Sequence, residues 1–139
     1  MTTIAWDGKT LAVDSRATTS GVIRSDRVKK LWKIGDEWIA VSGRFDETML
    51  VVEWIRAGRP QDRKPTLSED FGAMILRRKK LYRIESKLAE WPIDAPFAAG
   101  GSGFEIALGA MAAGADAVTA VKIASRFDTG TGGRVRASR

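Results

Sequence analysis

Apolar and polar residues alternate through the first third of the chain in a pattern typical of β-hairpins. The segment TTIAWDGKTLAVDSRATT (2–19) predicts two strands and a tight turn, because Asp7-Gly8 between alternating apolar runs is a strong hairpin signal. A second hairpin is predicted over DRVKKLWKIGDEWIAVSG (26–43), with its turn at Gly35-Asp36. We therefore expect β-structure up to residue 43.

A helical pattern follows. The segment FDETMLVVEWIRAG (45–58) predicts a helix with Asp46 as N-cap and Gly58 at its end. Apolar residues nearly encircle this helix, which indicates burial by more than one neighbour, and another subunit is one candidate. Residues 59–70 predict a loop.

The second half adds three kinds of element. A third hairpin is predicted over 71–86, and a short strand with a Gly-rich turn over 95–103. Helices are predicted near 103–114 and 115–128, the latter with Val118, Val121, Ala124 and Phe127 on one face, and GRVRAS (133–138) predicts a last strand.

The order of these elements indicates the fold class. Strands come first, then one helix, more strands, two helices and a final strand, which favours an α+β protein with helices outside two sheets over a doubly wound parallel sheet. A chain of 139 residues is of ordinary size for one domain, so we expect a single domain over 1–139.

The absence of His and Cys restricts the possible chemistry. It excludes disulfides, Ser-His-Asp and Cys-His catalysis and nearly every zinc site, so no metal and no cofactor are expected. A hydrolase of this composition must use a carboxylate, a lysine or its own α-amine as base, and the α-amine has a reference pKa of about 7.7–8.0. No segment predicts a membrane span or a secretion signal, and we expect a cytoplasmic protein.

The net charge of +6 leaves a second class of function open. Basic residues are scattered, and the run RRKK (77–80) is expected to be a solvated hairpin tip. A basic nucleic-acid-binding module is the alternative, although no nucleic-acid motif accompanies the charge.

Two residues of opposite charge are predicted to meet in the interior. Period-2 geometry places Lys30 on one face with Val28, Trp32 and Ile34, among hydrophobic residues. A buried ammonium needs a partner, and Asp14 is the candidate. Such a pair is as often structural as functional.

Two Gly-containing turns are further candidates. Gly43 in VSG ends a strand before a helix, where it is either a plain turn or a backbone N–H that can approach a ligand closely. Ser102 lies in GGSGFEIALG, which fails the G-x-G-x-x-G phosphate motif at Ile106, so this serine is either a helix cap or a hydroxyl aimed at a site.

Jointly, four segments resemble the proteasome β-subunit family of N-terminal-nucleophile hydrolases, and HslV-type peptidases most closely. These segments are TTIAWDGKTLAVDSRAT, VKKLWKIGDEWIAVSG, GGSGFEIALGAM and DTGTGG, in the order and spacing of that family. The resemblance implies a four-layer αββα sandwich with two antiparallel sheets between helix layers. It also implies a threonine-type peptidase acting on peptides or unfolded proteins.

The resemblance also implies the roles of individual residues. Thr2 is the nucleophile once Met1 is removed, with its α-amine as general base. Asp14 is the acidic residue of the second strand, Lys30 lies beside the nucleophile, and the Gly43 N–H is the oxyanion-hole donor. A small second residue favours removal of Met1, which we therefore expect.

Three later residues complete the expected site. Ser102 matches the serine of the family's G-S-G turn, with Asp128 behind it, and Thr131 is a looser match to a Ser or Thr near the amine.

The resemblance further implies a ring-type homo-oligomer and an ATP-dependent unfoldase partner. Two departures bear on these expectations. The loop 59–70 stands where relatives carry a second long helix, which puts the double ring in doubt, and Arg44 and Phe45 could narrow or recharge the substrate pocket. A catalytically inactive structural subunit with the same fold is the other alternative.

Overall fold

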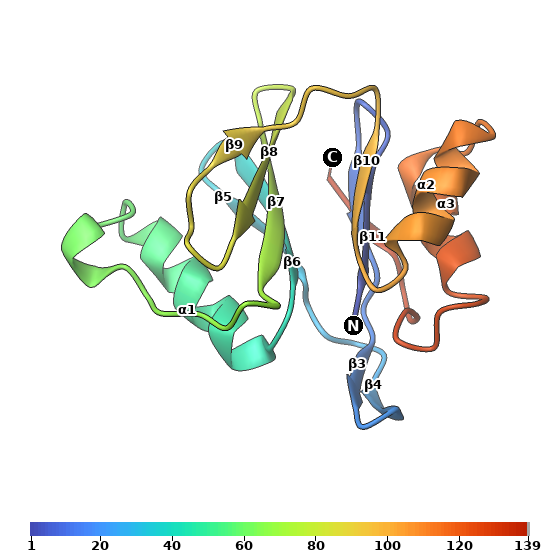
Figure 1. The fold of residues 1–139 in the computed structure, drawn as a ribbon, viewed down its shortest axis with the longest axis horizontal. Coiled ribbons are helices and arrows are strands. Elements are labelled where there is room, and N and C mark those ends of the chain that lie inside the picture. Colours follow the sequence, from blue (N-terminus) through green and yellow to red (C-terminus); the bar gives the residue numbers. More distant parts are fainter. Residues whose placement is uncertain (139) are drawn as a thin grey trace.

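Two β-sheets pack face to face and helices cover both of their outer faces (Figure 1). The computed structural model describes residues 1–138. Helix α1 (Phe45–Arg56) lies outside one sheet, and α2 (Phe104–Ala112) and α3 (Ala117–Ala124) lie outside the other. The predicted α+β class and four-layer αββα arrangement are confirmed.

The sheet beneath α2 and α3 contains the first predicted hairpin. Its strands run in the order β10-β1-β2-β11 and pair antiparallel, with Ile4 opposite Val13. The turn is held by the Asp7 carboxylate, which accepts hydrogen bonds from the backbone N–H groups of Lys9 and Thr10. The strand bounds are β1 (Thr3–Trp6), β2 (Leu11–Val13), β10 (Ala98–Gly101) and β11 (Arg136–Ala137).

The sheet beneath α1 contains the other two predicted hairpins. It is an antiparallel meander in the order β5-β6-β7-β8-β9, with turns at Gly35-Asp36 and Arg78-Lys79. Its strands are β5 (Leu31–Ile34), β6 (Glu37–Ser42), β7 (Gly72–Arg77), β8 (Lys80–Glu85) and β9 (Trp91–Pro92).

The second strand ends earlier than predicted. It stops at Val13, and a separate two-stranded ribbon of β3 (Ala17–Thr19) and β4 (Val22–Ser25) projects from the body. The break occurs because the Asp14 carboxylate accepts the Arg16 N–H at 3.2 Å, and such local side-chain bonds compete with a strand ladder.

Helix α1 differs from its prediction in its cap and its exposed side. Its N-cap is Arg44, and Asp46 lies in the first turn, where its carboxylate accepts the Glu47 N–H and pairs with Arg44. Leu50 is exposed, so the helix buries only one side. Its apolar residues are therefore not buried all the way round, in contrast to what the sequence indicates. The following loop contains a short 3₁₀ helix, η1 (Gln61–Arg63).

Helix α3 also presents a different face from the one predicted. Asp116 caps it by accepting the Thr119 N–H, and the helix ends at Ala124. Phe127 lies beyond that end and is exposed, so it does not belong to the buried face, which consists of Ala117, Ala120, Val121 and Ala124.

The core consists of three apolar layers that match the three interfaces of the sandwich. One lies between α1 and its sheet, one between the two sheets and one between the second sheet and α2 with α3. None of the helices within residues 1–138 has the length and apolarity needed to cross a membrane.

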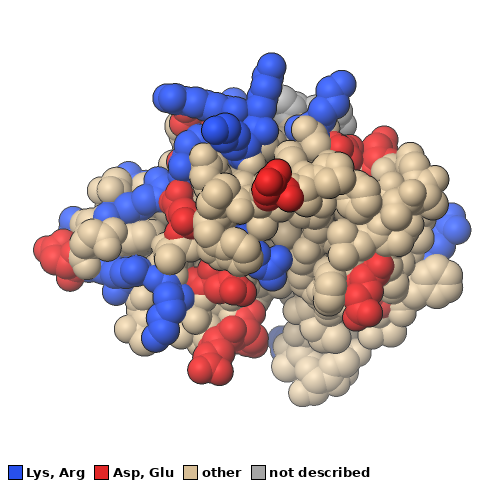
Figure 2. Space-filling model, turned by 45° about the horizontal axis from the view of Figure 1, so that its top comes forward, with Lys and Arg blue, Asp and Glu red and all other residues tan. Residues whose placement is uncertain are grey.

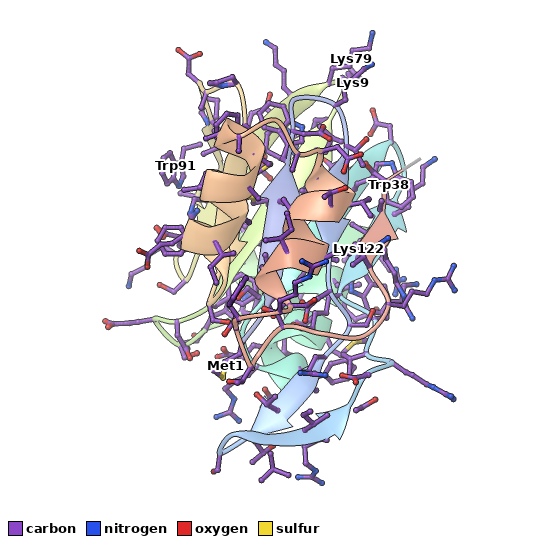
Figure 3. The ribbon with its side chains drawn as sticks, turned by 90° about the vertical axis from the view of Figure 1, so that its right-hand side faces the viewer. Met1, Lys9, Trp38, Lys79, Trp91 and Lys122 are labelled. Carbon is purple, nitrogen blue, oxygen red and sulfur yellow. The ribbon has the colours of Figure 1, made fainter. Side chains whose placement is uncertain are left out.

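Basic side chains gather at the end of the molecule that lies away from Met1. Figure 2 shows Lys and Arg side chains crowded along one edge, and Figure 3 places Lys9 and Lys79 at the same end of the molecule, far from Met1. Arg78 and Lys79 form the exposed turn of the β7–β8 hairpin, as predicted for RRKK. Arg77 departs from that prediction, because it lies on β7 and is partly buried in ion pairs with Glu37 and Glu90.

A closed ring of four charges joins the loop after α1 to the sheet beneath that helix. Arg59 and Arg77 each pair with both Glu37 and Glu90, at N–O distances of 2.6–2.9 Å. All four side chains are partly buried. The pair of Arg78 with Asp36 is exposed to solvent on both sides.

We predict that Glu37→Gln lowers the free energy of unfolding by about 2 kcal/mol, because it leaves two partly buried guanidinium groups short of a carboxylate. The neighbouring substitution Asp36→Asn removes only an exposed pair and should cost less than about 0.5 kcal/mol. Urea denaturation of both variants tests this, and equal losses would contradict it.

Candidate active site

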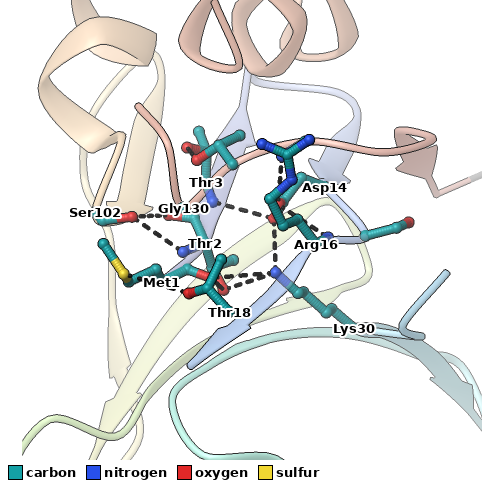
Figure 4. A network of polar contacts seen from close by, with 12 residues as sticks. Met1, Thr2, Thr3, Asp14, Arg16, Thr18, Lys30, Ser102 and Gly130 are labelled. Carbon is teal, nitrogen blue, oxygen red and sulfur yellow. Dashed lines mark hydrogen bonds and ion pairs between the residues drawn. The ribbon is translucent and has the colours of Figure 1, made fainter. Parts of the chain in front are cut away.

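The Asp14 carboxylate is the buried centre of a polar network at one end of the two sheets (Figure 4). Its side chain is 0% exposed, and it accepts four hydrogen bonds. Oδ1 accepts from Thr3 N at 3.2 Å and Lys30 Nζ at 3.0 Å, and Oδ2 accepts from Arg16 N at 3.2 Å and Gly132 N at 3.0 Å. Four donors offset the cost of burying this charge.

Lys30 joins this carboxylate to the hydroxyl of Thr2. The lysine is only 8% exposed, and Nζ donates to Asp14 Oδ1 at 3.0 Å, to Thr2 Oγ1 at 3.0 Å and to the Met1 carbonyl at 3.2 Å. Burial lowers the pKa of Lys30 below its ordinary value, while the charge and hydrogen bond of Asp14 act in the opposite direction. The predicted Lys30–Asp14 pair is confirmed.

The prediction that Lys30 shares a face with Trp32 and Ile34 is wrong. Trp32 and Ile34 pack toward the layer beneath α1. Lys30 precedes β5, so it is outside the alternation of that strand, and its side chain reaches toward the other sheet. The predicted burial of Lys30 is confirmed, but strand alternation is not its cause.

Thr2 lies immediately before β1 and is 2% exposed. Its Oγ1 accepts from Lys30 and donates to the Met1 carbonyl at 2.6 Å. Its backbone N–H donates to Ser102 Oγ at 3.1 Å. The hydroxyl and the nitrogen of one residue are therefore held by different partners, as Figure 4 shows.

Ser102, Asp128 and Thr131 form the second part of the network. Ser102 Oγ donates to Asp128 Oδ2 at 2.6 Å, which leaves its lone pairs to accept the Thr2 N–H. Thr131 Oγ1 donates to the same Asp128 oxygen at 2.5 Å and contacts Thr3 Oγ1 at 2.6 Å. Thr131 therefore contacts the hydroxyl of Thr3, whereas the sequence resemblance implied a position near the Thr2 amine.

The pKa of Asp128 is lowered below its usual range. Partial burial acts to raise it, but the hydrogen bonds from Ser102, Thr131 and the Gly130 N–H outweigh that effect. The carboxylate is thus held in its charged form by the hydroxyl that contacts Thr2 N.

Gly43 lies at the same opening as Thr2 but contacts neither Thr2 nor Lys30 by a hydrogen bond. Its φ of +131° is a conformation that favours glycine, and a Cβ there would come within 3.3 Å of Phe71 Cα. Within residues 1–138 the Gly43 N–H has no hydrogen-bond partner, so this donor is free to meet a ligand.

A cleft of about 460 Å³ opens beside these residues, and Met1, Thr2, Lys30 and Gly43 all line it. The β3–β4 ribbon and the first turn of α1 form its other walls. Within the described part of the chain, no three acidic side chains are grouped as a metal ion would require.

Arg16 is a site residue that the sequence reasoning missed. It pairs with Asp26 through two hydrogen bonds at 2.7 and 3.2 Å and donates to the Thr129 carbonyl at 3.3 Å, which links the ribbon to the loop after Asp128. Its only sequence signal is an acidic residue ten positions later, which is too weak to single out.

The lowered pKa of Asp128 has a consequence for stability. A carboxyl whose folded-state pKa lies below its unfolded value of 3.8 contributes stability above that pH, and this contribution is lost as the pH falls through the folded pKa. At pH 7 we predict that Asp128→Asn is less stable than wild type by about 1 kcal/mol, a figure that allows for solvent screening.

Urea denaturation between pH 7 and pH 3 tests this prediction. The difference between wild type and Asp128→Asn should shrink below about pH 4, whereas a constant difference would contradict it. Asp36→Asn, on the exposed β5–β6 turn, reports the general effect of removing one negative charge.

Comparison with known proteins shows the fold. No protein-family model matches the chain, and no curated protein matches it. Solved structures that match include BPH of Thiobacillus denitrificans, at 18% identity and a TM-score of 0.74, over 99% of this chain and 95% of that one. The same protein in complex with epoxomicin matches at 20% identity and a TM-score of 0.73, over 99% and 96%.

Eukaryotic HslV from Trypanosoma brucei matches at 17% identity and a TM-score of 0.71, over 99% of this chain and 97% of that one. The likeness extends over nearly the whole length of each protein. This chain therefore has the four-layer fold of BPH and HslV.

Proposed function

We propose that this protein is a threonine-type peptidase in which Thr2, freed by removal of Met1, is the nucleophile. The observation that carries the proposal is the contact of Thr2 Oγ1 with Lys30 Nζ at 3.0 Å, in a cleft, with Asp14 holding the lysine. A hydroxyl is a poor nucleophile without an adjacent base, and this chain has no histidine to serve as one.

The α-amine of Thr2 supplies the base in this proposal. While Met1 is present, the Thr2 nitrogen is an amide and cannot accept a proton, and the hydroxyl proton is directed at the Met1 carbonyl. Removal of Met1 converts the nitrogen to an amine with a reference pKa of about 7.7–8.0. The Lys30 ammonium, close to Oγ1, disfavours a second positive charge nearby and so keeps the amine neutral.

The reaction then proceeds in two steps. Oγ1 bonds to the scissile carbonyl carbon while its proton moves to the α-amine, directly or through one water. That proton passes to the leaving amine as the C–N bond breaks. Water next attacks the acyl-threonine ester while the amine again accepts a proton. The bond between Oγ1 and the acyl carbon then breaks, the proton returns to Oγ1, and the free carboxylic acid leaves.

The other residues assist these steps. Lys30 favours the developing alkoxide, and Asp14 keeps Lys30 in place. The unpartnered Gly43 N–H lies in the same cleft and is the proposed donor to the tetrahedral oxyanion, a contribution on the order of 3 kcal/mol. Ser102 and Asp128 orient the amine through the contact seen at the Thr2 nitrogen.

The proposed active form is a homo-oligomer that shelters the Thr2 sites. Exposed apolar side chains support this part of the proposal: Val22 and Ile23 project on the β3–β4 ribbon, and Phe45 and Leu50 lie on α1. A ring arrangement and an ATP-dependent unfoldase stay predictions of the sequence resemblance.

A catalytically inactive subunit is the second candidate, and one observation favours it. Met1 is accommodated in the structure, where it packs against Gly130 and accepts a weak contact from Thr18. A retained Met1 would leave Thr2 without an amine, so the mass of the N-terminus separates the two candidates.

We predict that protein lacking Met1 hydrolyses fluorogenic peptides and that Thr2→Ala lowers turnover at least about 1000-fold, because the nucleophile is lost. Thr2→Ser should keep part of the activity. Lys30→Met should lose most of it. Epoxomicin, the ligand in the BPH complex, should bind wild type but not Thr2→Ala.

Turnover is measured by fluorescence, and the N-terminus by intact-protein mass spectrometry. Lys33→Met is a matched control, because Lys33 lies on β5 over the Trp38 ring, outside the cleft. Equal turnover by Thr2→Ala and wild type, both without Met1, would overturn the proposal.

A further inference from the structure

The cleft beside Thr2 has more positive than negative side chains. Asp46 is the one carboxylate among the described residues that line it. The basic residues that line it are Arg16, Arg24, Lys29, Lys30 and Arg44.

Two of these positive charges are already compensated by buried or partly buried partners. Lys30 pairs with Asp14 at 3.0 Å, and Arg16 pairs with Asp26 at 2.7 Å. Because each of these carboxylates lies close to its partner, neither Lys30 nor Arg16 offers a full positive charge to a ligand.

Arg24 and Lys29 differ from Lys30 and Arg16 because no carboxylate compensates their charge within residues 1–138. Both are exposed, and neither has an ion pair with any residue in 1–138. Lys29 Nζ lies 4.2 Å from the centre of the Trp32 ring, which restricts where its charge can move. These two side chains place uncompensated positive charge on the cleft wall.

The wall formed by α1 reinforces this charge. The pair of Arg44 with Asp46 is 67% and 64% exposed, and such a pair contributes little, so a ligand carboxylate can replace Asp46 at small cost. Arg44 is also the N-cap of α1 and makes no side-chain cap. The first turn of α1 lines the cleft, so the positive end of the helix dipole lies beside it.

The apolar part of the cleft lies deeper. Val41 is buried and Val28 is half-buried, and both line the cleft. A side chain with two methylene groups and a terminal carboxylate would place its apolar stem against these valines and its charge at the basic rim, which matches glutamate.

We propose that this cleft selects peptides with an acidic side chain, glutamate above all, on the acyl side of the scissile bond, and that Arg24 and Lys29 determine this specificity. The inference rests on the proposed function, in which Thr2 attacks from this cleft. We assign the preference to the acyl side because this part of the substrate becomes bonded to Thr2 Oγ1, and Thr2 lines the same cleft as Arg24 and Lys29.

The test compares fluorogenic peptides that differ at one acyl-side position at a time, with Glu, Gln or Lys at that position. Wild type without Met1 should cleave the best Glu peptide about tenfold more efficiently, in kcat/KM, than its Gln counterpart, since two exposed charge contacts together are worth about one order of magnitude. The ratio should fall as salt is added.

Variants assign the preference to residues. In Arg24→Gln/Lys29→Gln the Glu-to-Gln ratio should fall to near one. Lys33→Gln removes an exposed lysine on β5 that does not line the cleft, and it should keep the wild-type ratio.

The outcomes separate the two proposals. Thr2-dependent turnover with a Glu-to-Gln ratio of one or less at every position overturns the specificity but not the peptidase. A ratio above one that the double variant leaves unchanged also overturns the assignment to Arg24 and Lys29. No Thr2-dependent turnover of any peptide, including the Gln and Lys series, overturns the peptidase itself.

Discussion

The buried pair of Lys30 and Asp14 is the interaction on which the polar end of this molecule depends. Asp14 follows β2 in one sheet and Lys30 precedes β5 in the other, so the pair crosses between the sheets. Neither charge is tolerable in the interior without the other. Because Nζ has a further hydrogen for Thr2 Oγ1, the same pair that joins the sheets also positions the threonine hydroxyl.

Close backbone approach is the second constraint, and it explains the Gly-rich turn before α2. A Cβ at Gly101 would collide with the Thr2 carbonyl, and one at Gly103 would collide with Thr3 Oγ1. Only glycine lets β10 and the start of α2 lie against the first residues of β1. This turn therefore serves to bring Ser102 to the Thr2 nitrogen, with Asp128 behind it, which is a different task from binding a phosphate.

Local signals predicted the parts of the fold that local interactions decide. The three hairpins were predictable because strand alternation and the turn residues lie within a few positions of each other. The break at Asp14 was not, because the carboxylate that accepts the local Arg16 N–H is also held by the Gly132 N–H, from 118 residues away. The N-cap of α1 and the exposure of Phe127 were also missed, because α1 begins at Phe45, before the predicted cap, and α3 ends at Ala124, before Phe127.

The sequence by itself determined the order of the elements and the available chemistry. With no histidine or cysteine, and with a lysine expected in the interior, it restricted the candidate bases and named the candidate residues. Only the tertiary structure decided which of those residues meet. Thr2, Lys30 and Ser102 come from segments up to 100 residues apart, and they converge because the packing of the layers brings those segments together. The positive charge of the cleft is likewise decided by the tertiary structure, because the β3–β4 ribbon and the start of α1 each contribute basic residues to its walls.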